Sequence, residues 1–259
     1  MRSLEEGEIQ LIAIDPPFCS GSVRKSERSG EDVQFDDCWK GGVQSYVQWL
    51  VPRLRECHRL LKDTGVLSLH LDQSASHYAK VELDKIFGEG NFINEIIWSY
   101  KSGGASKRSF AKKHDNILVY SRGKKWTFNV QKEKDYKRKK VGINNGGASC
   151  THFLKDHIGV YNLVIPRDVW EIPIINSQAH ERAGYPTQKP LPLYEKIIKA
   201  FTNEEDIVAD FFCGSGTTLV ASQNLGRKWI GADASNYAIN FVCRRMNRDH
   251  NVYPPIRRA

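Results

Sequence analysis

The first residues in this chain that could take part in catalysis are Asp15-Pro16-Pro17-Phe18. They place a carboxylate and an aromatic ring directly after the apolar run at residues 11–14. Two consecutive prolines end a strand because neither can donate to a β-ladder, so the acid and the ring are held at a stiff strand end. Ligands bind at such strand ends in open α/β sheets. A proline turn capped by Asp15 would have the same residue pattern, so a purely structural role for these residues stays open.

The same four residues suit methylation of an exocyclic amine on a nucleic-acid base. The Asp15 carboxylate and the Pro16 carbonyl can accept both amine hydrogens, which localises a lone pair that the ring otherwise delocalises. An aspartate with a reference pKa of about 3.9 is ionised at neutral pH. It would orient the amine and stabilise its developing positive charge rather than deprotonate it. Phe18 would stack on a base rotated out of the duplex. C5-cytosine chemistry needs a Pro-Cys pair, and Phe18 separates Pro17 from Cys19.

A second strand end carries a glycine turn of the kind by which a backbone passes close to a nucleotide, at Asp210-Phe211-Phe212-Cys213-Gly214-Ser215-Gly216-Thr217-Thr218. The dinucleotide fingerprint wants Gly or Ala three residues beyond Gly216, where this chain has Leu219, so a pyrophosphate is disfavoured. S-adenosylmethionine has no phosphate and needs close backbone approach, a carboxylate for its ammonium group and an acid for its ribose. We expect Asp210 and Asp233 to take these two places, although a Gly-x-Gly turn alone fits a structural role equally well.

The composition limits the class of protein and its partners. A chain of 259 residues is long enough for one large α/β domain with an inserted subdomain. No stretch approaches the roughly 20 apolar residues of a membrane span, and the N-terminus lacks a signal peptide's apolar core, which predicts a cytoplasmic protein. The net charge of +8 favours a polyanionic partner. The six cysteines form no C-x-x-C pair, and Cys150 and His152 have no second ligand pair nearby, so we expect neither disulfides nor a metal.

Strand and helix patterns alternate over the first hundred residues and again after Lys189, which predicts a mostly parallel, doubly wound sheet. The spacing of apolar residues predicts helices at 45–61, 74–87, 189–201, 217–224 and 235–248, and strands at 11–14, 66–71, 93–100, 117–120, 207–211 and 229–233. Residues 19–42 lack such periodicity and are expected to form a long loop over the active face. We therefore expect a catalytic and cofactor-binding domain of residues 1–100 and 171–259, interrupted by a basic insertion at 101–170.

The expected insertion is rich in lysine and arginine, which are interleaved with aromatic side chains and few acids. This mixture suits phosphate contacts combined with base stacking, although a charge run is often only a solvated face. The candidate DNA contacts are Lys101, Lys107, Arg108, Lys112, Lys113, Lys124 and Lys125.

Taken together and in this order, the motifs resemble those of DNA amino-methyltransferases of the permuted class, in which the catalytic motif precedes the cofactor motif. The nearest likeness is to adenine-N6 modification subunits of restriction-modification systems. It is carried by Asp15-Pro16-Pro17-Phe18, the segment at 52–72, His114-Asp115-Asn116-Ile117-Leu118-Val119-Tyr120, Tyr185-Pro186-Thr187-Gln188-Lys189-Pro190 and the Gly-x-Gly turn. The likeness covers nearly the whole chain and is weakest at residues 126–169. It implies a Rossmann-like S-adenosylmethionine-dependent methyltransferase fold with an inserted recognition region.

The resemblance also implies a cofactor, S-adenosyl-L-methionine, and a substrate, double-stranded DNA. By this likeness residues 101–169 read the target sequence, and the cofactor pocket is lined by Gln188, Lys189, Pro190, Phe212, Gly214, Gly216, Thr217 and Thr218. Aspartate at position 15 points to adenine N6, because cytosine-N4 relatives typically have serine there, and N4-cytosine stays open as the alternative. A homodimer, which is common among such proteins, and a restriction-subunit partner both stay open.

Two features depart from the family pattern. Relatives usually begin with an additional strand whose acidic residue helps hold the cofactor adenine, whereas only a short segment precedes Asp15 here. We therefore expect the sheet edge beside the cofactor to be incomplete. Asp233 stands where relatives more often have glutamate. Two alternatives follow: a truncated, non-catalytic DNA-binding homologue, and a structured-RNA methyltransferase, because the chemistry at Asp15 does not distinguish DNA from RNA adenine.

Overall fold

The structure is a computed structural model that describes residues 1–21, 23–25, 34–102, 104, 107–136, 153–176 and 178–251. At residues 23–25 and 34–36 it describes the backbone. The described chain forms two compact units, one comprising Met1–Phe128 and Asp168–Ala259 and the other comprising Asn129–Arg167. Cys150 and His152, considered above as metal ligands, lie outside the described residues.

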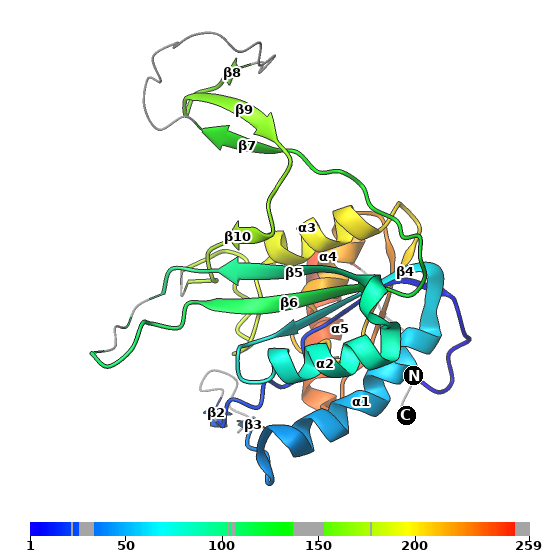
Figure 1. The fold of residues 1–259 in the computed structure, drawn as a ribbon. Helices are drawn as coiled ribbons and strands as arrows, with labels where there is room; N and C mark the ends of the chain where they lie inside the picture. Colours follow the sequence, from blue (N-terminus) through cyan, green and yellow to red (C-terminus); the bar gives the residue numbers. More distant parts are fainter. Residues whose placement is uncertain are drawn as a thin grey trace. The chain divides into compact units, whose positions relative to one another are not determined.

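A seven-stranded sheet forms the centre of the larger unit, in the order β10-β5-β6-β4-β1-β11-β12 (Figure 1). Its strands are β1 (Ile9–Ile14), β4 (Leu61–Leu71), β5 (Phe92–Ser99), β6 (His114–Ser121), β10 (Val169–Glu171), β11 (Ile207–Asp210) and β12 (Lys228–Gly231). Strand β6 runs antiparallel to both of its neighbours, and the remaining pairs are parallel. The expected mostly parallel sheet is confirmed, and in the described part of the chain β12 is its last strand on the β11 side.

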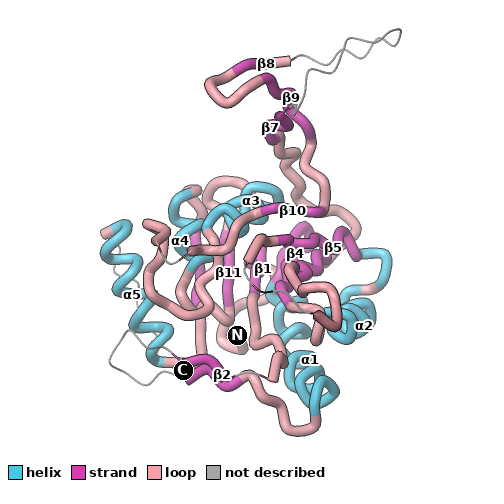
Figure 2. Tube along the Cα trace, turned by 90° about the vertical axis from the view of Figure 1, so that its left-hand side faces the viewer, coloured by secondary structure: helices cyan, strands magenta, loops and turns pink. Residues whose placement is uncertain are grey.

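Helices cover both faces of this sheet, as Figures 1 and 2 show. They are α1 (Gly42–Leu60), α2 (Ser76–Phe87), α3 (Leu191–Phe201), α4 (Thr217–Asn224) and α5 (Asn236–His250), with a short 3₁₀ turn at Glu89–Asn91. Successive side chains of a strand point to opposite faces. In β1, Ile12 and Ile14 pack with α1 and α2, whereas Leu11 and Ala13 pack with α3 and α4. Strand β1 is therefore buried on both sides, which explains its uninterrupted apolar run.

Three short strands of the structure, β2 (Val23–Lys25), β3 (Gln34–Asp36) and β10, were not predicted from the sequence. Residues 19–42 were expected to contain no regular element, yet β2 and β3 pair antiparallel, and α1 already begins at Gly42. Strand β10 was not predicted either, although it pairs in parallel with β5. All three strands have three residues, which is too few to show an alternating pattern.

The smaller unit is a three-stranded antiparallel sheet in the order β7-β9-β8. Its strands are β7 (Glu133–Tyr136), β8 (Leu154–Lys155) and β9 (Val160–Val164). The Asp156 carboxylate ties the sheet together, because it accepts from Lys134 Nζ at 2.6 Å and from the Tyr136 hydroxyl at 2.8 Å. These two bonds hold the pKa of Asp156 well below its usual range, against the smaller effect of burial.

No helix within the described ranges combines the length and the apolar character needed to cross a membrane.

Candidate functional site

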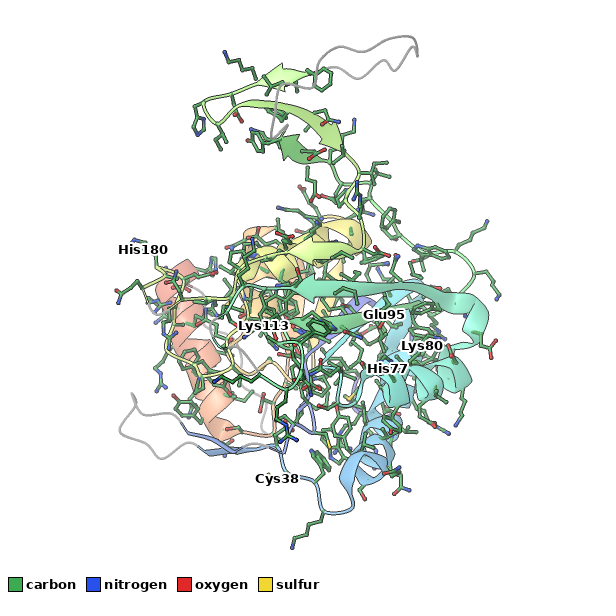
Figure 3. The ribbon with its side chains drawn as sticks, turned by 60° about the vertical axis from the view of Figure 1, so that its left-hand side comes forward. Cys38, His77, Lys80, Glu95, Lys113 and His180 are labelled. Atoms are coloured by element: carbon green, nitrogen blue, oxygen red, sulfur yellow. The ribbon has the colours of Figure 1, made fainter. Side chains whose placement is uncertain are left out.

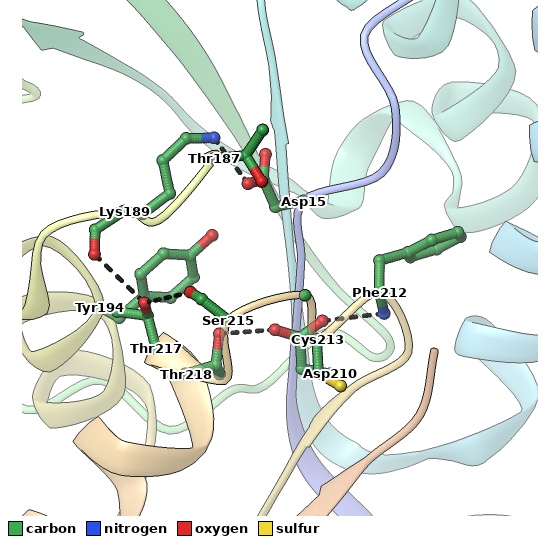
Figure 4. A pocket seen from close by; sticks show the side chains of 11 residues that line it. Asp15, Thr187, Lys189, Tyr194, Asp210, Phe212, Cys213, Ser215, Thr217 and Thr218 are labelled. Atoms are coloured by element: carbon green, nitrogen blue, oxygen red, sulfur yellow. Dashed lines mark hydrogen bonds and ion pairs between the residues drawn. The ribbon is translucent and has the colours of Figure 1, made fainter. Parts of the chain in front are cut away.

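The two predicted strand ends meet at one edge of the sheet, because β1 pairs in parallel with β11, with Leu11 opposite Val208 and Ile12 opposite Ala209. Asp15 directly follows β1, and Asp210 is the last residue of β11. Residues of both motifs line one pocket (Figure 4). It is lined by Asp15, Thr187, Lys189, Tyr194, Asp210, Phe212, Cys213, Gly214, Ser215, Thr217 and Thr218.

The two oxygens of Asp15 face different surroundings. Oδ2 accepts a hydrogen bond from Lys189 Nζ at 2.6 Å, on the side of the pocket. Oδ1 lies 3.6 Å from Nδ1 of His70, a side chain that is only 2% exposed. Asp15 thus presents one oxygen to the pocket and turns the other toward the interior of the sheet.

Lys189 makes two of the three contacts that the sequence predicts for a flipped base, those to Asp15 and to Phe18. Its ammonium group donates to Asp15 Oδ2 and lies 4.6 Å from the centre of the Phe18 ring. A cation over an aromatic face at this distance is held by the ring quadrupole. The resemblance implies that Lys189 lies in the cofactor pocket, and in the structure it also contacts Asp15 and Phe18.

Behind Asp15 lies a buried polar chain that the sequence did not reveal. His70 Nε2 is 3.1 Å from Oδ2 of Asp115, and the Tyr100 hydroxyl donates to Oδ1 of the same carboxylate at 3.1 Å. Burial acts to raise the pKa of Asp115, but the hydrogen bond to His70 and the nearby charges of His70 and Lys189 outweigh it and lower this pKa. Asp115 is therefore a charged group inside the sheet edge.

The glycine turn is built for close packing. Gly214 and Gly216 have φ angles of 46° and 75°, in the left-handed region that glycine adopts without strain. A Cβ atom at Gly216 would lie 2.9 Å from Cγ2 of Val242, so position 216 also lacks room for a side chain. Asp233 Oδ2 accepts from the Gly214 N–H at 2.9 Å, and its Oδ1 accepts from the Ser235 N–H at 2.9 Å. Asp233 thus fastens the turn to the segment after β12.

Asp210 is the most buried acid of the pocket. Its Oδ1 accepts from the Phe212 N–H at 3.0 Å, and its Oδ2 accepts from the Thr218 hydroxyl at 2.7 Å. Burial raises the pKa of Asp210 to about 7 despite these two bonds, and the charges of Asp15 and Asp233 act in the same direction. A fixed cation beside this group would keep it ionised.

The segment before α3 forms the remaining wall. The Gln188 amide donates to the Glu181 carbonyl at 2.6 Å and accepts from the Ala183 N–H at 2.7 Å. These two hydrogen bonds link the ends of the loop at residues 181–188. The Thr217 hydroxyl donates to the Lys189 carbonyl at 3.2 Å, which links this loop to α4. Among the predicted cofactor residues, Lys189, Asp210, Phe212, Gly214, Thr217 and Thr218 line the pocket, whereas Gln188, Pro190, Gly216 and Asp233 are not among its lining residues.

The predicted basic residues fall into two groups. Lys101, Lys107, Arg108, Lys112 and Lys113 lie between β5 and β6, and β5 ends at the same sheet edge as β1 because β6 runs antiparallel to both β5 and β4. Lys113 is labelled in Figure 3, and its ammonium group donates to the Ser102 hydroxyl at 2.8 Å across this connection.

Lys124 and Lys125 instead follow the far end of β6. There the Arg122 N–H donates to the Gly65 carbonyl near the start of β4, and Ser121 stands opposite Val66. These two lysines are therefore at the sheet edge opposite Asp15. Within the residues that the structure describes, no group of three His, Cys, Asp or Glu side chains has a metal-binding arrangement.

The amino-acid sequence is similar to those of known DNA methyltransferases. The family model N6_N4_Mtase, DNA methylase, matches residues 9–243. The chain is 30% identical over 258 residues to the Type II methyltransferase M.HpaI of Haemophilus parainfluenzae, over 99% of this chain and 74% of that protein. It is 29% identical over 255 residues to the DNA adenine methyltransferase YhdJ of Escherichia coli (strain K12), over 95% of this chain and 79% of that protein.

The fold has close counterparts among solved structures. The PvuII DNA methyltransferase (cytosine-N4-specific) is similar with a TM-score of 0.63 and 18% identity, over 93% of this chain and 81% of that one. TTHA0409 of Thermus thermophilus, solved with S-adenosyl-L-methionine, has a TM-score of 0.60 and 19% identity, over 96% and 89%. These structures confirm the predicted Rossmann-like fold. Because the family model spans most of the chain and the motifs meet in one pocket, the chain belongs to the DNA methylase family N6_N4_Mtase.

Proposed function

We propose that this chain transfers a methyl group from S-adenosyl-L-methionine to the exocyclic N6 amine of adenine in DNA, at a specific sequence. The observation that carries the proposal is that Asp15 and the glycine turn line one pocket, where the Lys189 ammonium contacts both Asp15 and the Phe18 ring. An acid, a stacking ring and a nucleotide-binding turn at one sheet edge are what transfer to a flipped base requires.

The acid would act by position and charge. The target amine would enter between Asp15 and Phe18, donate one hydrogen to Asp15 Oδ2 and the other to the Pro16 carbonyl, and stack its ring on Phe18. Positive charge develops on nitrogen as the methyl group arrives, and the Asp15 carboxylate stabilises this charge. The nitrogen–methyl bond would form as the sulfonium carbon–sulfur bond breaks, which leaves S-adenosylhomocysteine, and the alkylated nitrogen would then lose one proton to water. Lys189 must withdraw from Oδ2 when the amine arrives, because it occupies the same two contacts.

The pocket residues fit S-adenosyl-L-methionine, which supplies an electrophilic methyl group when bound. Asp210 offers a buried carboxylate for the ammonium group. Gly214 leaves the backbone open on the pocket side, and Phe212 provides an apolar surface packed on Trp49 with ring centres 5.8 Å apart. Asp233 is the candidate for the ribose hydroxyls, although in this structure its oxygens accept the two backbone N–H groups described above.

Replacing Asp233 with alanine is expected to weaken cofactor binding about tenfold, because it removes both the ribose acceptor and the bond that fastens Gly214. Isothermal titration with S-adenosylhomocysteine measures the change. Titration of its 2′-deoxyribose analogue separates the two roles: if Asp233 binds the ribose, the parent chain loses affinity for the analogue and Asp233→Ala shows little further loss. An affinity unchanged in Asp233→Ala would contradict both roles.

We propose that the connection between β5 and β6 contacts DNA phosphates, since it carries five basic residues at the edge where Asp15 lies. The unit at Asn129–Arg167 is the candidate for reading sequence. A homodimer and a restriction partner remain predictions from the resemblance.

The two groups of lysines allow a matched comparison. Lys101→Ala/Lys107→Ala should lower DNA affinity and reduce the slope of log K against log salt by about 2, because each lost phosphate contact contributes about 0.9. Lys124→Ala/Lys125→Ala removes the same charge at the opposite edge and should leave the slope unchanged. Fluorescence anisotropy at several salt concentrations measures both slopes. Equal slopes for the two double variants would exclude a specific role for the β5–β6 connection.

The function is tested by incubating the chain with methyl-tritiated S-adenosylmethionine and either mixed genomic DNA or structured RNA. Digestion to nucleosides should place the label in N6-methyldeoxyadenosine. Label in N4-methyldeoxycytidine would overturn the assignment to adenine, and label confined to RNA would overturn DNA as the substrate. Cofactor-free DNA binding without any transfer would support a non-catalytic homologue.

A further inference from the structure

His70 occupies an unusual position, since it lies between two acids that come from different strands. Asp15 follows β1, Asp115 belongs to β6, and His70 stands in β4 between these two strands. Its ring is 2% exposed and is 3.6 Å from one carboxylate and 3.1 Å from the other. Burial of a polar group is costly unless its hydrogen-bonding atoms are paired, so both nitrogens of this buried ring are expected to have partners.

The pairing is incomplete on the side of Asp15. Within the described part of the chain, Asp15 Oδ1 and His70 Nδ1 are both buried and without a hydrogen-bond partner, and they face each other. Their separation exceeds an ordinary hydrogen bond by only several tenths of an ångström. A small rotation of either side chain would close this gap and satisfy both atoms at once.

The protonation state of the ring decides whether both acids are satisfied. A neutral imidazole donates from one nitrogen only, so it would leave one carboxylate facing a lone pair. A ring protonated on both nitrogens donates to Asp15 and to Asp115 together. The Lys189 ammonium also faces Asp15, and the Tyr100 hydroxyl also donates to Asp115. The cluster therefore pairs two carboxylates with His70, Lys189 and one phenol.

Aromatic contacts fix the ring itself. The centre of the His70 ring lies 5.5 Å from that of Phe18 and 5.5 Å from that of Trp98, with the Trp98 ring edge-on at 75°. Trp98 is in turn anchored, because its indole N–H donates to the Ile172 carbonyl at 2.8 Å. The same imidazole thus borders both members of the catalytic motif, the acid and the ring.

We propose that His70 is a positioning residue for Asp15, and this inference rests on the function proposed above. By holding Oδ1 toward the interior, with Asp115 fixing its far nitrogen, His70 turns Oδ2 toward the pocket, where the amine is to be bound. Through its contact with Phe18 it keeps the stacking ring in register with the acid. A misplacement of about 1 Å in such a site can cost about 100-fold in rate.

Three substitutions at one position test this role. His70→Phe keeps an aromatic ring against Phe18 and Trp98 but removes both nitrogens. His70→Asn places an amide near the Nδ1 position, facing Asp15, whereas His70→Gln places one near the Nε2 position, facing Asp115. The parent chain and all three variants are compared in single-turnover and steady-state methylation of the same DNA. Titration with S-adenosylhomocysteine and thermal melting report whether each variant folds and binds cofactor.

We expect His70→Phe and His70→Gln to lower kcat about 100-fold with KM for DNA and cofactor affinity within about threefold of the parent chain. His70→Asn should stay within about tenfold of the parent kcat, because it restores the contact to Asp15. An unchanged kcat in His70→Phe, or equal losses in His70→Asn and His70→Gln, would overturn the inference. Loss of cofactor binding in step with kcat would overturn it too, by showing a structural role. An inactive parent chain would instead refute the proposed function, whereas a parent active on cytosine would leave the His70 test valid.

Discussion

Replacing Asp15 with alanine is expected to lower the rate of methyl transfer at least about 1000-fold while the cofactor affinity stays within about threefold of the parent chain. The reason is that Asp15 Oδ2 faces the pocket and is the acceptor proposed for the target amine. Loss of a single preorganised group that stabilises developing charge costs about 100- to 1000-fold in rate. Here the substitution also frees Lys189 and leaves His70 without its second acid, which adds to the loss.

The measurement is single-turnover transfer of a tritiated methyl group, with calorimetric titration of S-adenosylhomocysteine as the readout for the cofactor. Asp63→Ala is the matched control, because it removes an aspartate side chain that is 96% exposed at the opposite sheet edge. The control should behave as the parent chain does. If Asp15→Ala retained more than about a tenth of the parent rate, a different group would have to orient the amine.

The second large effect is expected at Asp210, where cofactor affinity should depend on pH. Burial raises the pKa of this carboxyl to about 7, so it is mostly protonated at pH 5.5 and mostly ionised at pH 8.5. Only the ionised form pairs with the ammonium group of the cofactor. The apparent affinity of the parent chain for S-adenosylhomocysteine should therefore rise about 30-fold between these two pH values, by proton linkage to one group.

Asp210→Asn should remove this pH dependence, because the amide cannot ionise. It keeps an acceptor for the Phe212 N–H, so the turn can retain its shape. At pH 8.5 the variant should bind at least about tenfold more weakly than the parent, as expected when a charge-assisted hydrogen bond becomes a neutral one. Calorimetric titration at both pH values measures the two affinities, and an equally steep pH dependence in the variant would assign the titration to another group.

Stability without cofactor should change in the opposite sense. The pKa of Asp210 is about 7 in the folded chain and about 3.9 for an unperturbed aspartate, so the folded state binds more protons than the unfolded state between these values. The free energy of unfolding of the parent chain therefore loses a contribution as pH rises from about 4 to about 7. Asp210→Asn does not show this pH-dependent loss of stability. Its Tm should therefore gain on that of the parent as pH rises from about 4 to about 7 and keep this advantage at pH 8.5, as scanning calorimetry can show.

The two strand ends that carry the motifs could be predicted from the sequence because each motif is short and its residues are constrained locally. Asp15 and Gly216 each sit in a turn whose residues are constrained by proline or by a positive φ angle, and both turns follow strands with apolar runs. Parallel pairing of β1 with β11 then brings them together, as the alternating pattern of strands and helices indicated.

The polar chain behind Asp15 was not predicted because it depends on strand pairing rather than on spacing. In the sequence His70 is an ordinary position in a predicted buried strand, and Asp115 lies just before the strand predicted at residues 117–120. Their contact exists because β6 runs antiparallel to β4 with Ile117 opposite His70, so Asp115, two residues from Ile117 on the same face, lies diagonally across from His70. No local pattern in either strand carries that information.

Strand direction also explains why one basic run divides in two. Lys112 and Lys124 belong to the same stretch of positive charge in the sequence, yet β6 lies between them and crosses the whole sheet. The composition indicates one basic region, whereas the fold places one part of it at the sheet edge where Asp15 lies and the other part at the opposite edge.

The central claim is that the acid at the end of β1 directs methyl transfer to adenine N6. It is tested most directly by sequencing DNA from cells that express either the parent chain or Asp15→Ala, with a method that detects modified bases. DNA from cells with the parent chain should contain N6-methyladenine within one recurring sequence, and DNA from cells with Asp15→Ala should lack it. Modified cytosine, or adenine methylation that persists in Asp15→Ala, would contradict the central claim.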